Sequence, residues 1–241
     1  MEYWRAYKLV TITTLVSAVM LLLIYGWYNF KVSDRSFEVG DFNKVYAGGL
    51  MTVYLKQGKE TSVSVRADDF MIDKVRVEVI DGELRIYNDD GISGERVTDA
   101  YVTYTSLHQI TANNAATIIS QDEIQTNTLS IQSLGSSETK IRLRCDTLKL
   151  DMKGVANVQL AGDAHFFQFS IHDLGDLMAY HFKTKNCDVE MHTGDQSPGI
   201  ARINVSDTLS ASIKGPRYIY YIGSPIIKKE SIIGTGRLIQ K

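Results

Sequence analysis

Five histidines are the residues in this sequence whose type best suits them to hold a metal ion. A transition-metal site needs several His, Cys or carboxylate side chains that converge on one point. Folding could bring His165 or His192 alongside His181, but the sequence contains no His-Glu-x-x-His motif and no Cys-x-x-Cys pair. Isolated histidines in strands usually face solvent, so we expect no metal site and no cofactor. The histidines and the carboxylates near them are His108, His165, His172, Asp173, Asp176, His181 and His192.

The carboxylates could cleave a polysaccharide if two of them lay a few ångströms apart, in the roles of acid and base or nucleophile. Asp151 and Asp173 occupy comparable positions in two neighbouring repeats, described below, and could stack on each other. Stacked carboxylates repel unless a cation lies between them, and Lys153, two residues after Asp151, is the simpler partner. We therefore predict no catalytic residue and a protein that is not an enzyme.

Tyrosines and cysteines are the other side chains with distinctive chemistry. Tyr218, Tyr220 and Tyr221 could form a patch that binds a sugar or a protein, because tyrosine is enriched in interfaces. Aromatic residues are also common in strands, so packing in the last part of the fold is the simpler interpretation. Cys145 and Cys187 lie in strand-like segments, where isolated cysteines are usually small buried apolar residues. We expect both thiols to be free and buried.

The composition narrows the class of protein. Of 241 residues, 44% are apolar and 22% are charged, with 18 Gly, 3 Pro and 2 Cys. These values exclude a disordered chain, a collagen-like fibre and a small disulfide-rich domain. The formal net charge is −2, and it becomes −3 when Glu2, Arg5 and Lys8 are left out. This balance argues against a nucleic-acid partner, because such proteins carry a basic patch or stripe.

Residues 9–30 contain no charged side chain. About 20 predominantly apolar residues are enough for a helix to cross the hydrocarbon core of a bilayer. Arg5 and Lys8 precede this stretch and favour a cytoplasmic N-terminus, and aromatic residues gather at 25–28, as is typical of the membrane interface. The stretch therefore predicts a transmembrane helix.

A cleaved signal peptide is the alternative for this segment. It would need an apolar core of only ~7–15 residues and a cleavage site made of small residues. The residues after the apolar core, Tyr-Gly-Trp-Tyr-Asn, offer no such site. We therefore divide the chain into a short cytoplasmic N-terminus (1–8), a transmembrane signal anchor (9–30), a linker (31–36) and an ectodomain (37–241).

The segment 37–87 alternates apolar and polar residues with a period of two, which predicts half-buried strands. Residues 56–59 and 81–82 predict hairpin turns, the second more strongly because it is Asp-Gly. Residues 67–74 can make one helical turn with an aspartate, Asp68 or Asp69, as its N-cap. The expected strands are 51–55, 62–67, 75–80 and 83–87, followed by a loop at 88–99.

The chain begins to repeat itself near residue 107. Successive repeats start 21, 19, 19, 21 and 21 residues apart, and each contains two alternating strands separated by polar corners. Repeats of this length without helices are typical of a β-solenoid, whose coils bury their apolar sides only by stacking. An ordinary β-sandwich is the alternative, because its turns recur every ~8–12 residues. The repeats start at Leu107, Thr128, Thr147, Phe166, Cys187 and Thr208.

A more specific signal is carried by FNKVYAGGLMTVYLKQGKETSVSVRADD, VEVIDGELRIY, YVTYTSLHQITANNAA, IKGPRYIYYIGSP and SIIGTGRLIQ. In order and spacing these segments, over roughly residues 37–238, resemble the bacterial family of auto-transporter adhesins, head GIN domain. The resemblance implies a right-handed, all-β, helix-like domain in the envelope of Gram-negative bacteria, and it brings no catalytic residues. Residues 113–116 and Pro216 depart from the small residues usual in this family, and we expect them to alter corner geometry only.

The residues and the resemblance together predict an all-β, right-handed β-solenoid ectodomain preceded by one N-terminal transmembrane helix. We expect a single-pass inner-membrane protein with a cytoplasmic N-terminus and a periplasmic solenoid, or, as the alternative, a cleaved and exported one. Its expected partners are the lipid bilayer, through residues 9–30, and an envelope protein or glycan bound without catalysis, but no nucleic acid. A carbohydrate-active β-helix enzyme and an envelope signalling or regulatory subunit are the alternative functions.

Overall fold

The computed structural model describes residues 16–22, 32–69, 71–88, 98–192 and 199–241. As the alternating pattern predicts, the described chain after residue 31 is built almost wholly of β-strands. The strands of the first half are β1 (Val32–Phe37), β2 (Lys44–Gly48), β3 (Thr52–Gln57), β4 (Ser62–Asp68), β5 (Val75–Ile80), β6 (Glu83–Asn88), β7 (Thr98–Tyr104), β8 (Gln109–Asn113) and β9 (Thr117–Ser120). The later strands are β10 (Ile124–Gln125), β11 (Thr128–Gly135), β12 (Glu138–Gly154), β13 (Asn157–Asp173), β14 (Asp176–His192), β15 (Ile200–Lys214), β16 (Tyr218–Ile222), β17 (Ile226–Ile233) and β18 (Arg237–Gln240).

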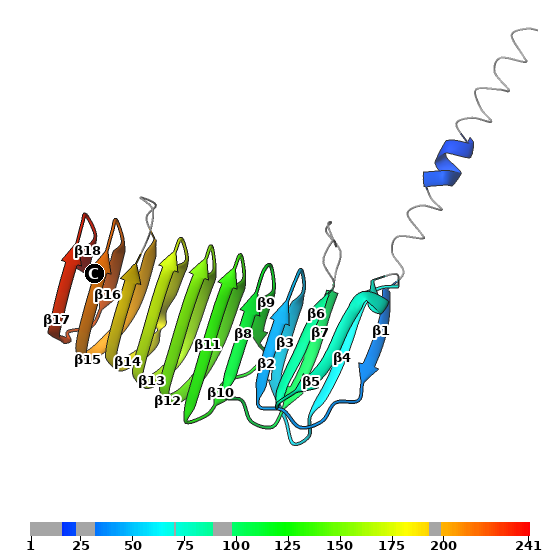
Figure 1. The fold of residues 1–241 in the computed structure, drawn as a ribbon, viewed down its shortest axis with the longest axis horizontal. Coiled ribbons are helices and arrows are strands. Elements are labelled where there is room, and N and C mark those ends of the chain that lie inside the picture. The colour runs from blue at the N-terminus through cyan, green and yellow to red at the C-terminus, as the bar shows by residue number, and fades with distance from the viewer. Residues whose placement is uncertain (1–15, 23–31, 70, 89–97, 193–198) are drawn as a thin grey trace, which may run out of the picture.

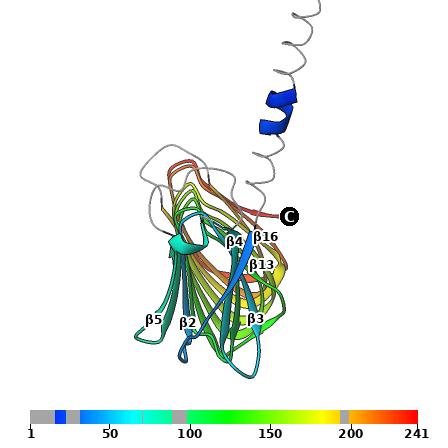
Figure 2. The same ribbon diagram turned by 90° about the vertical axis from the view of Figure 1, so that its right-hand side faces the viewer.

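The strands form a flattened β-solenoid of about 6 turns with two long sides (Figures 1 and 2). We call one side sheet 1: it runs through β5, β6, β2, β8, β11, the second halves of β12 to β15, and β17. The other side, sheet 2, runs through β1, β4, β7, β3, β9, the first halves of β12 to β15, β16 and β18. The prediction of an all-β solenoid rather than a sandwich is confirmed, because strands of successive repeats pair in parallel along each side.

Each long strand bends from sheet 2 into sheet 1. In β12, residues 138–145 pair with β9 and β13, and residues 147–154 pair with β11 and β13. The predicted 19-residue steps are confirmed here, because Thr128 pairs with Thr147, which pairs with Phe166. The next repeat starts one residue earlier than predicted, at Asn186 rather than Cys187. β14 carries one extra residue between Met178 and His181, which lengthens the step relative to the preceding one by one residue and not by the predicted two.

The first coils follow an order that the sequence did not indicate. The coil β2–β3 lies between the coil β6–β7 and the coil β8–β9, so the chain adds a coil on one side of β2–β3 before returning to the other side. Residues 81–82 form the predicted hairpin turn, with both residues at positive φ, between antiparallel β5 and β6. The predicted hairpin at 56–59 is wrong, because β7 lies between β3 and β4 and pairs with both.

Two further predictions near the N-terminal end of the solenoid need correction. The single helical turn exists as η1 (Ile72–Lys74), but its N-cap is Met71 and no side chain caps it. Most of the expected linker (31–36) belongs to β1 (Val32–Phe37), which pairs antiparallel with β4. Phe37 packs against the core, and Arg66 of β4 donates hydrogen bonds to Asp34. Apolar and polar contacts therefore both hold β1 against the solenoid.

The corners that end the sheet 1 strands need left-handed backbone. Gly135 and Gly154 have φ values of 69° and 85°, and a Cβ on Gly154 would lie 2.6 Å from the carbonyl oxygen of Gly135 in the coil below. Asn114 takes the same corner position with φ 58°. The departure from small residues at 113–116 therefore leaves the corner conformation intact, since asparagine tolerates left-handed backbone better than most residues.

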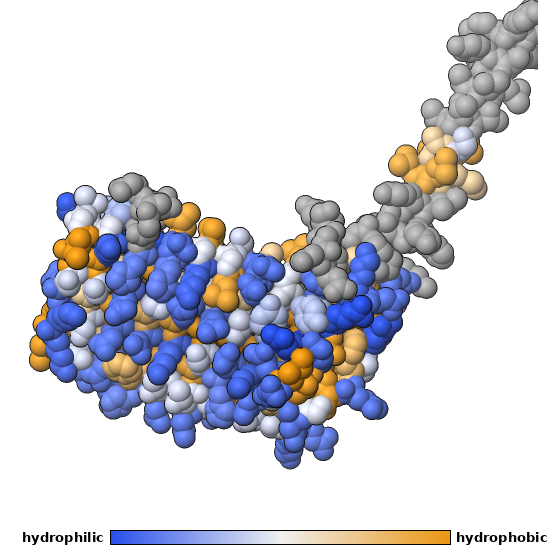
Figure 3. Space-filling view, viewed as in Figure 1, coloured by the Kyte–Doolittle hydropathy of each residue, from blue (hydrophilic) through white to orange (hydrophobic). Residues whose placement is uncertain are grey.

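The interior is one continuous apolar core built from the inward residues of both sheets. Phe167 in sheet 1 lies edge-on to Phe182 in sheet 2 with ring centroids 5.4 Å apart, and it also contacts Phe169 at 4.9 Å. Phe182 aligns with Gly162 in the preceding coil, where a Cβ would lie 2.0 Å from the carbonyl oxygen of Leu143. The outer surface in view is mainly polar, with small apolar patches (Figure 3).

The predicted transmembrane helix at 9–30 falls largely outside the described residues. Residues 16–22 within it are helical, and their apolar side chains are exposed. In the part of the chain that the structure describes, no helix combines the length and the apolar character needed to span a bilayer. The predicted loop at 88–99 lies mainly in 89–97, which is also outside the described residues.

Candidate binding groove

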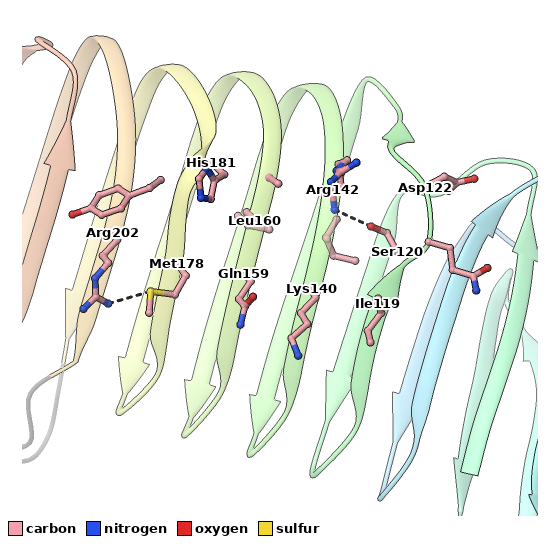
Figure 4. Close-up of a pocket in the computed structure, with 14 residues that line it drawn as sticks. Ile119, Ser120, Asp122, Lys140, Arg142, Gln159, Leu160, Met178, His181 and Arg202 are labelled. Carbon is pink, nitrogen blue, oxygen red and sulfur yellow. Dashed lines mark hydrogen bonds between the residues drawn. The ribbon is translucent and has the colours of Figure 1, made fainter. Parts of the chain in front are cut away.

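A groove of about 580 Å³ lies on the outer side of sheet 2. Parallel register places outward residues of successive coils in rows, and the central row contains Lys140, Gln159, Met178 and Arg202. This row continues to Ile119 on one side and to Tyr220 on the other. The central row crosses β12, β13, β14 and β15 (Figure 4).

The groove owes its depth to a small residue in the adjacent row. Ala161 pairs with Arg142 on one side and with His181 on the other. Both neighbours, Arg142 and His181, are long, exposed side chains (Figure 4). The alanine between them leaves room for the hollow. Beside it, the extra residue in β14 turns both Tyr180 and His181 outward, and both line the groove.

Three cationic or titratable side chains of the groove have no carboxylate partner. Among the described residues, no ion pair involves Arg142, His181 or Arg202. Arg202 instead contacts the Met178 sulfur at 3.1 Å and lies 5.9 Å from the centroid of the Tyr220 ring. Lys140 is the exception, with Glu138 2.9 Å away. Lys140, Arg142 and Arg202 outnumber Asp122, the one carboxylate among the lining residues, so the groove offers net positive charge to a ligand.

A second hollow, of about 760 Å³, lies where the strands bend between the sheets. Its central cation, Arg144, is 3.2 Å from Asp163 and 3.8 Å from Glu123. His165 and Lys183 line the same hollow. Lys183 and Lys185 make no ion pair among the described residues, but two carboxylates, Asp146 and Asp163, also line this hollow, whereas Asp122 is the one carboxylate among the lining residues of the groove.

The five histidines do not gather at one point. His172 and His192 stack on the outside of sheet 1 with ring centroids 6.3 Å apart, whereas His181 lies in sheet 2. His108 precedes β8, and His165 lies at a bend. In the described residues, no group of three or more His, Cys, Asp or Glu side chains is placed to hold a metal ion.

The predicted stacking of Asp151 and Asp173 is wrong. Asp151 pairs with Ser170, and Asp173 pairs with Gly154 at a corner, where it has a φ of 72° and accepts the Gly154 N–H. As predicted, Lys153 is a partner of Asp151, at 3.1 Å. The Ser170 hydroxyl also donates to this carboxylate at 2.8 Å, and His172 lies 3.4 Å from it.

The tyrosines and cysteines are divided between surface and core. Tyr218 and Tyr220 stack on the outside of β16 with centroids 6.4 Å apart, and Tyr221 packs against the core. Cys145 and Cys187 are free and buried, which confirms the prediction. Burial raises the pKa of the Cys145 thiol to about 12, and it raises the pKa of the Cys187 thiol well above its usual value. Neither thiol is therefore suited to act as a nucleophile.

A family model described as "Putative auto-transporter adhesin, head GIN domain" matches residues 41–225. The chain belongs to this family. The match covers most of the segment in which the sequence resembles the head GIN domain. No match is found among curated proteins.

Solved structures show the same head GIN fold. A putative adhesin from Bacteroides fragilis has a TM-score of 0.79 at 22% identity, over 88% of this chain and 98% of that one. A putative lipid binding protein from Parabacteroides distasonis has a TM-score of 0.69 at 18% identity, over 88% and 98%. A putative adhesin from Parabacteroides merdae has a TM-score of 0.65 at 21% identity, over 88% and 97%. At these identities the likeness concerns the fold alone.

Two groove residues of this head GIN domain, Arg142 and Arg202, carried no sequence signal as a pair. They are 60 positions apart and belong to no motif. Alternation placed each of them on an outward position, but their places in adjacent rows and the hollow at Ala161 depend on the register of four coils. An exact alignment of the repeats, including the extra residue in β14, would have been the one signal able to reveal them.

Proposed function

We propose that this protein is a non-catalytic binding protein of the bacterial envelope, anchored in the inner membrane by residues 9–30, with the solenoid in the periplasm. Membership of a family named for adhesins and the β-solenoid fold support an adhesion role. The observation that carries the proposal is the sheet 2 groove, where Arg142 and Arg202 have no carboxylate partner among the described residues. Solenoids suit this role because they present extended surfaces to partners.

The membrane anchor is supported by the uncharged run and by the exposure of its described part. Val16, Met20 and Leu22 are 57%, 62% and 69% exposed in a helical segment that carries no charge. Such a segment gains free energy by entering lipid. Arg5 and Lys8 before it favour the proposed orientation.

The alternative of a carbohydrate-active enzyme depended on a close pair of carboxylates, and Asp151 and Asp173 do not form one. Asp151 and Asp173 lie at different positions of the coil, and each already accepts a hydrogen bond. We therefore retain binding as the function.

Two experiments test the proposal. N-terminal sequencing of the protein from a washed membrane fraction should give the start at residue 1, whereas a mature start near residue 30 would contradict the anchor. Crosslinking of the full chain in intact cells, followed by purification, should recover an envelope protein or glycan. A chain that recovers neither, in cells where it is expressed and folded, would contradict the binding role.

A further inference from the structure

The groove strands leave only side chains for recognition. The sheet 2 portions of β12, β13 and β14 each have a parallel neighbour on both sides, so no strand edge is open here. The ladder between β14 and β15 is interrupted after Ala179, where the side chain of Asn204 donates a hydrogen bond to the Tyr180 carbonyl oxygen. An extended peptide usually binds by adding a strand to an open sheet edge, and the groove has no such edge. A ligand here must be recognised by the charge and shape of the outward rows.

The basic side chains of the groove, of which Lys140 is paired with Glu138, are spaced along the direction in which the coils stack. Arg142 and His181 lie on strands two apart, which corresponds to roughly 9–10 Å at the usual strand spacing. Lys140 and Arg202 lie three strands apart, or roughly 14 Å. A linear ligand with negative charges at repeated intervals can meet several of these positions at once, and such multivalent contact strengthens binding.

The surface between and beside the cations suits sugar rings. Ala161 leaves room between Arg142 and His181, and the half-exposed Tyr180 lines the same hollow. The central row ends in aromatic residues on both sides: Tyr220 follows Arg202, and Tyr54, stacked on Tyr101 at 5.1 Å, follows Ile119. Aromatic rings of this kind offer a flat apolar face and a polar tip, which match the two kinds of surface on a pyranose.

We propose that the sheet 2 groove binds a linear acidic glycan, with its carboxylates on Arg142 and Arg202 and a sugar ring over Ala161. The assignment rests on the proposed binding function and adds the class of ligand. A glycan chain is stiffer than an acidic peptide, so it loses less conformational entropy when it is held along a row of side chains.

The test uses the full chain in detergent micelles and measures its affinity for polygalacturonate, a linear polymer of uronic acid. The double variant R142Q/R202Q should bind at least about tenfold more weakly than the wild type. The control variant K149Q/K214Q removes the same charge from exposed positions of sheet 1 and should bind as the wild type does. Binding by the wild type should also weaken strongly at about 1 M salt, where charges are screened beyond ~3 Å.

The other outcomes separate this inference from the proposed function. Equal binding of neutral dextran, or equal or tighter binding of poly-L-glutamate, would overturn the assignment of an acidic glycan. Equal loss in R142Q/R202Q and K149Q/K214Q would overturn the groove as the site. If R142Q/R202Q still recovers the cellular ligand as the wild type does, the inference fails while the binding function stands; if the wild type recovers none, both fail.

Discussion

Outward charges are arranged differently on the two sheets of the solenoid. On sheet 1, Asp151 accepts a hydrogen bond from Ser170 and lies near Lys153 and His172, so its charge is satisfied within the protein. On sheet 2, no described carboxylate pairs with Arg142 or Arg202, and a hollow lies beside them. The hollows on sheet 1 are smaller, at about 270 and 220 Å³.

This difference separates residues that stabilise the fold from residues that are free to bind. Both sheets have the same parallel ladder and share one core, so the backbone ladder does not explain why the hollow on sheet 2 is larger. The groove arises from the choice of outward side chains and from the extra residue in β14. The outward positions of the sheet 2 groove are therefore those at which mutations should alter binding without altering stability.

The largest expected effect tests whether the two sheets share a core. Phe182→Ala removes the sheet 2 ring that contacts Phe167 of sheet 1, and it should lower the free energy of unfolding by about 3–5 kcal/mol, measured by urea denaturation. Met178→Ala, on the outward side of the same strand, is the control and should cost no more than about 0.5 kcal/mol. A similar loss of unfolding free energy in both variants would contradict the assignment of Phe182 to the core and of Met178 to the outer surface.

The next effect concerns the glycine on which the sheet 2 strand depends. Gly162→Ala should lower the free energy of unfolding by roughly 2–4 kcal/mol, because φ is 110° and the Cβ would lie 2.0 Å from the Leu143 carbonyl oxygen. Gly40→Ala has no atom within 4 Å of its new Cβ and should change stability by less than about 0.5 kcal/mol. A stable Gly162→Ala variant would argue against the close approach of β12 and β13 at this point.

A smaller effect compares the charges of the two sheets directly. Asp151→Ala should lower the free energy of unfolding by about 1 kcal/mol, since the carboxylate is only partly exposed and has three partners. Arg142→Ala should change it by less than about 0.5 kcal/mol, because the guanidinium has no ion pair among the described residues. Chemical denaturation of both variants at low and high salt measures the difference. A larger loss of unfolding free energy in Arg142→Ala than in Asp151→Ala would contradict the contrast between the two sheets.

Local patterns in the sequence were sufficient to predict the strands, the solenoid and one hairpin. Alternation located the strands, and Asp81-Gly82 identified its turn because Asp-Gly tolerates the positive φ values required there. The order of the first coils could not be predicted, because the placement of β6–β7 outside β2–β3 is a long-range pairing with no local signal. For the same reason 56–59 was misjudged as a hairpin.

The candidate site was less predictable than the fold. The sequence placed Asp151 and Asp173 at comparable positions of neighbouring repeats. In the structure Asp151 lies within a strand and Asp173 lies at a corner with left-handed backbone. Both residues are aspartates, so their type did not reveal this difference in backbone conformation. The groove depends on an alanine between two long side chains from other coils. Alanine carries no functional signal in a sequence, so only the register exposes its role.

The most direct test of the account is to fill the groove and measure both binding and stability. The full chain carrying Ala161→Trp, compared with the control Ser212→Trp on an outward position of sheet 1, should be assayed for polygalacturonate affinity and for its urea unfolding midpoint. The account predicts that Ala161→Trp weakens binding at least about tenfold while its midpoint, like both properties of Ser212→Trp, stays at the wild-type value. Wild-type affinity in a folded Ala161→Trp variant would contradict the claim that sheet 2 holds the binding site.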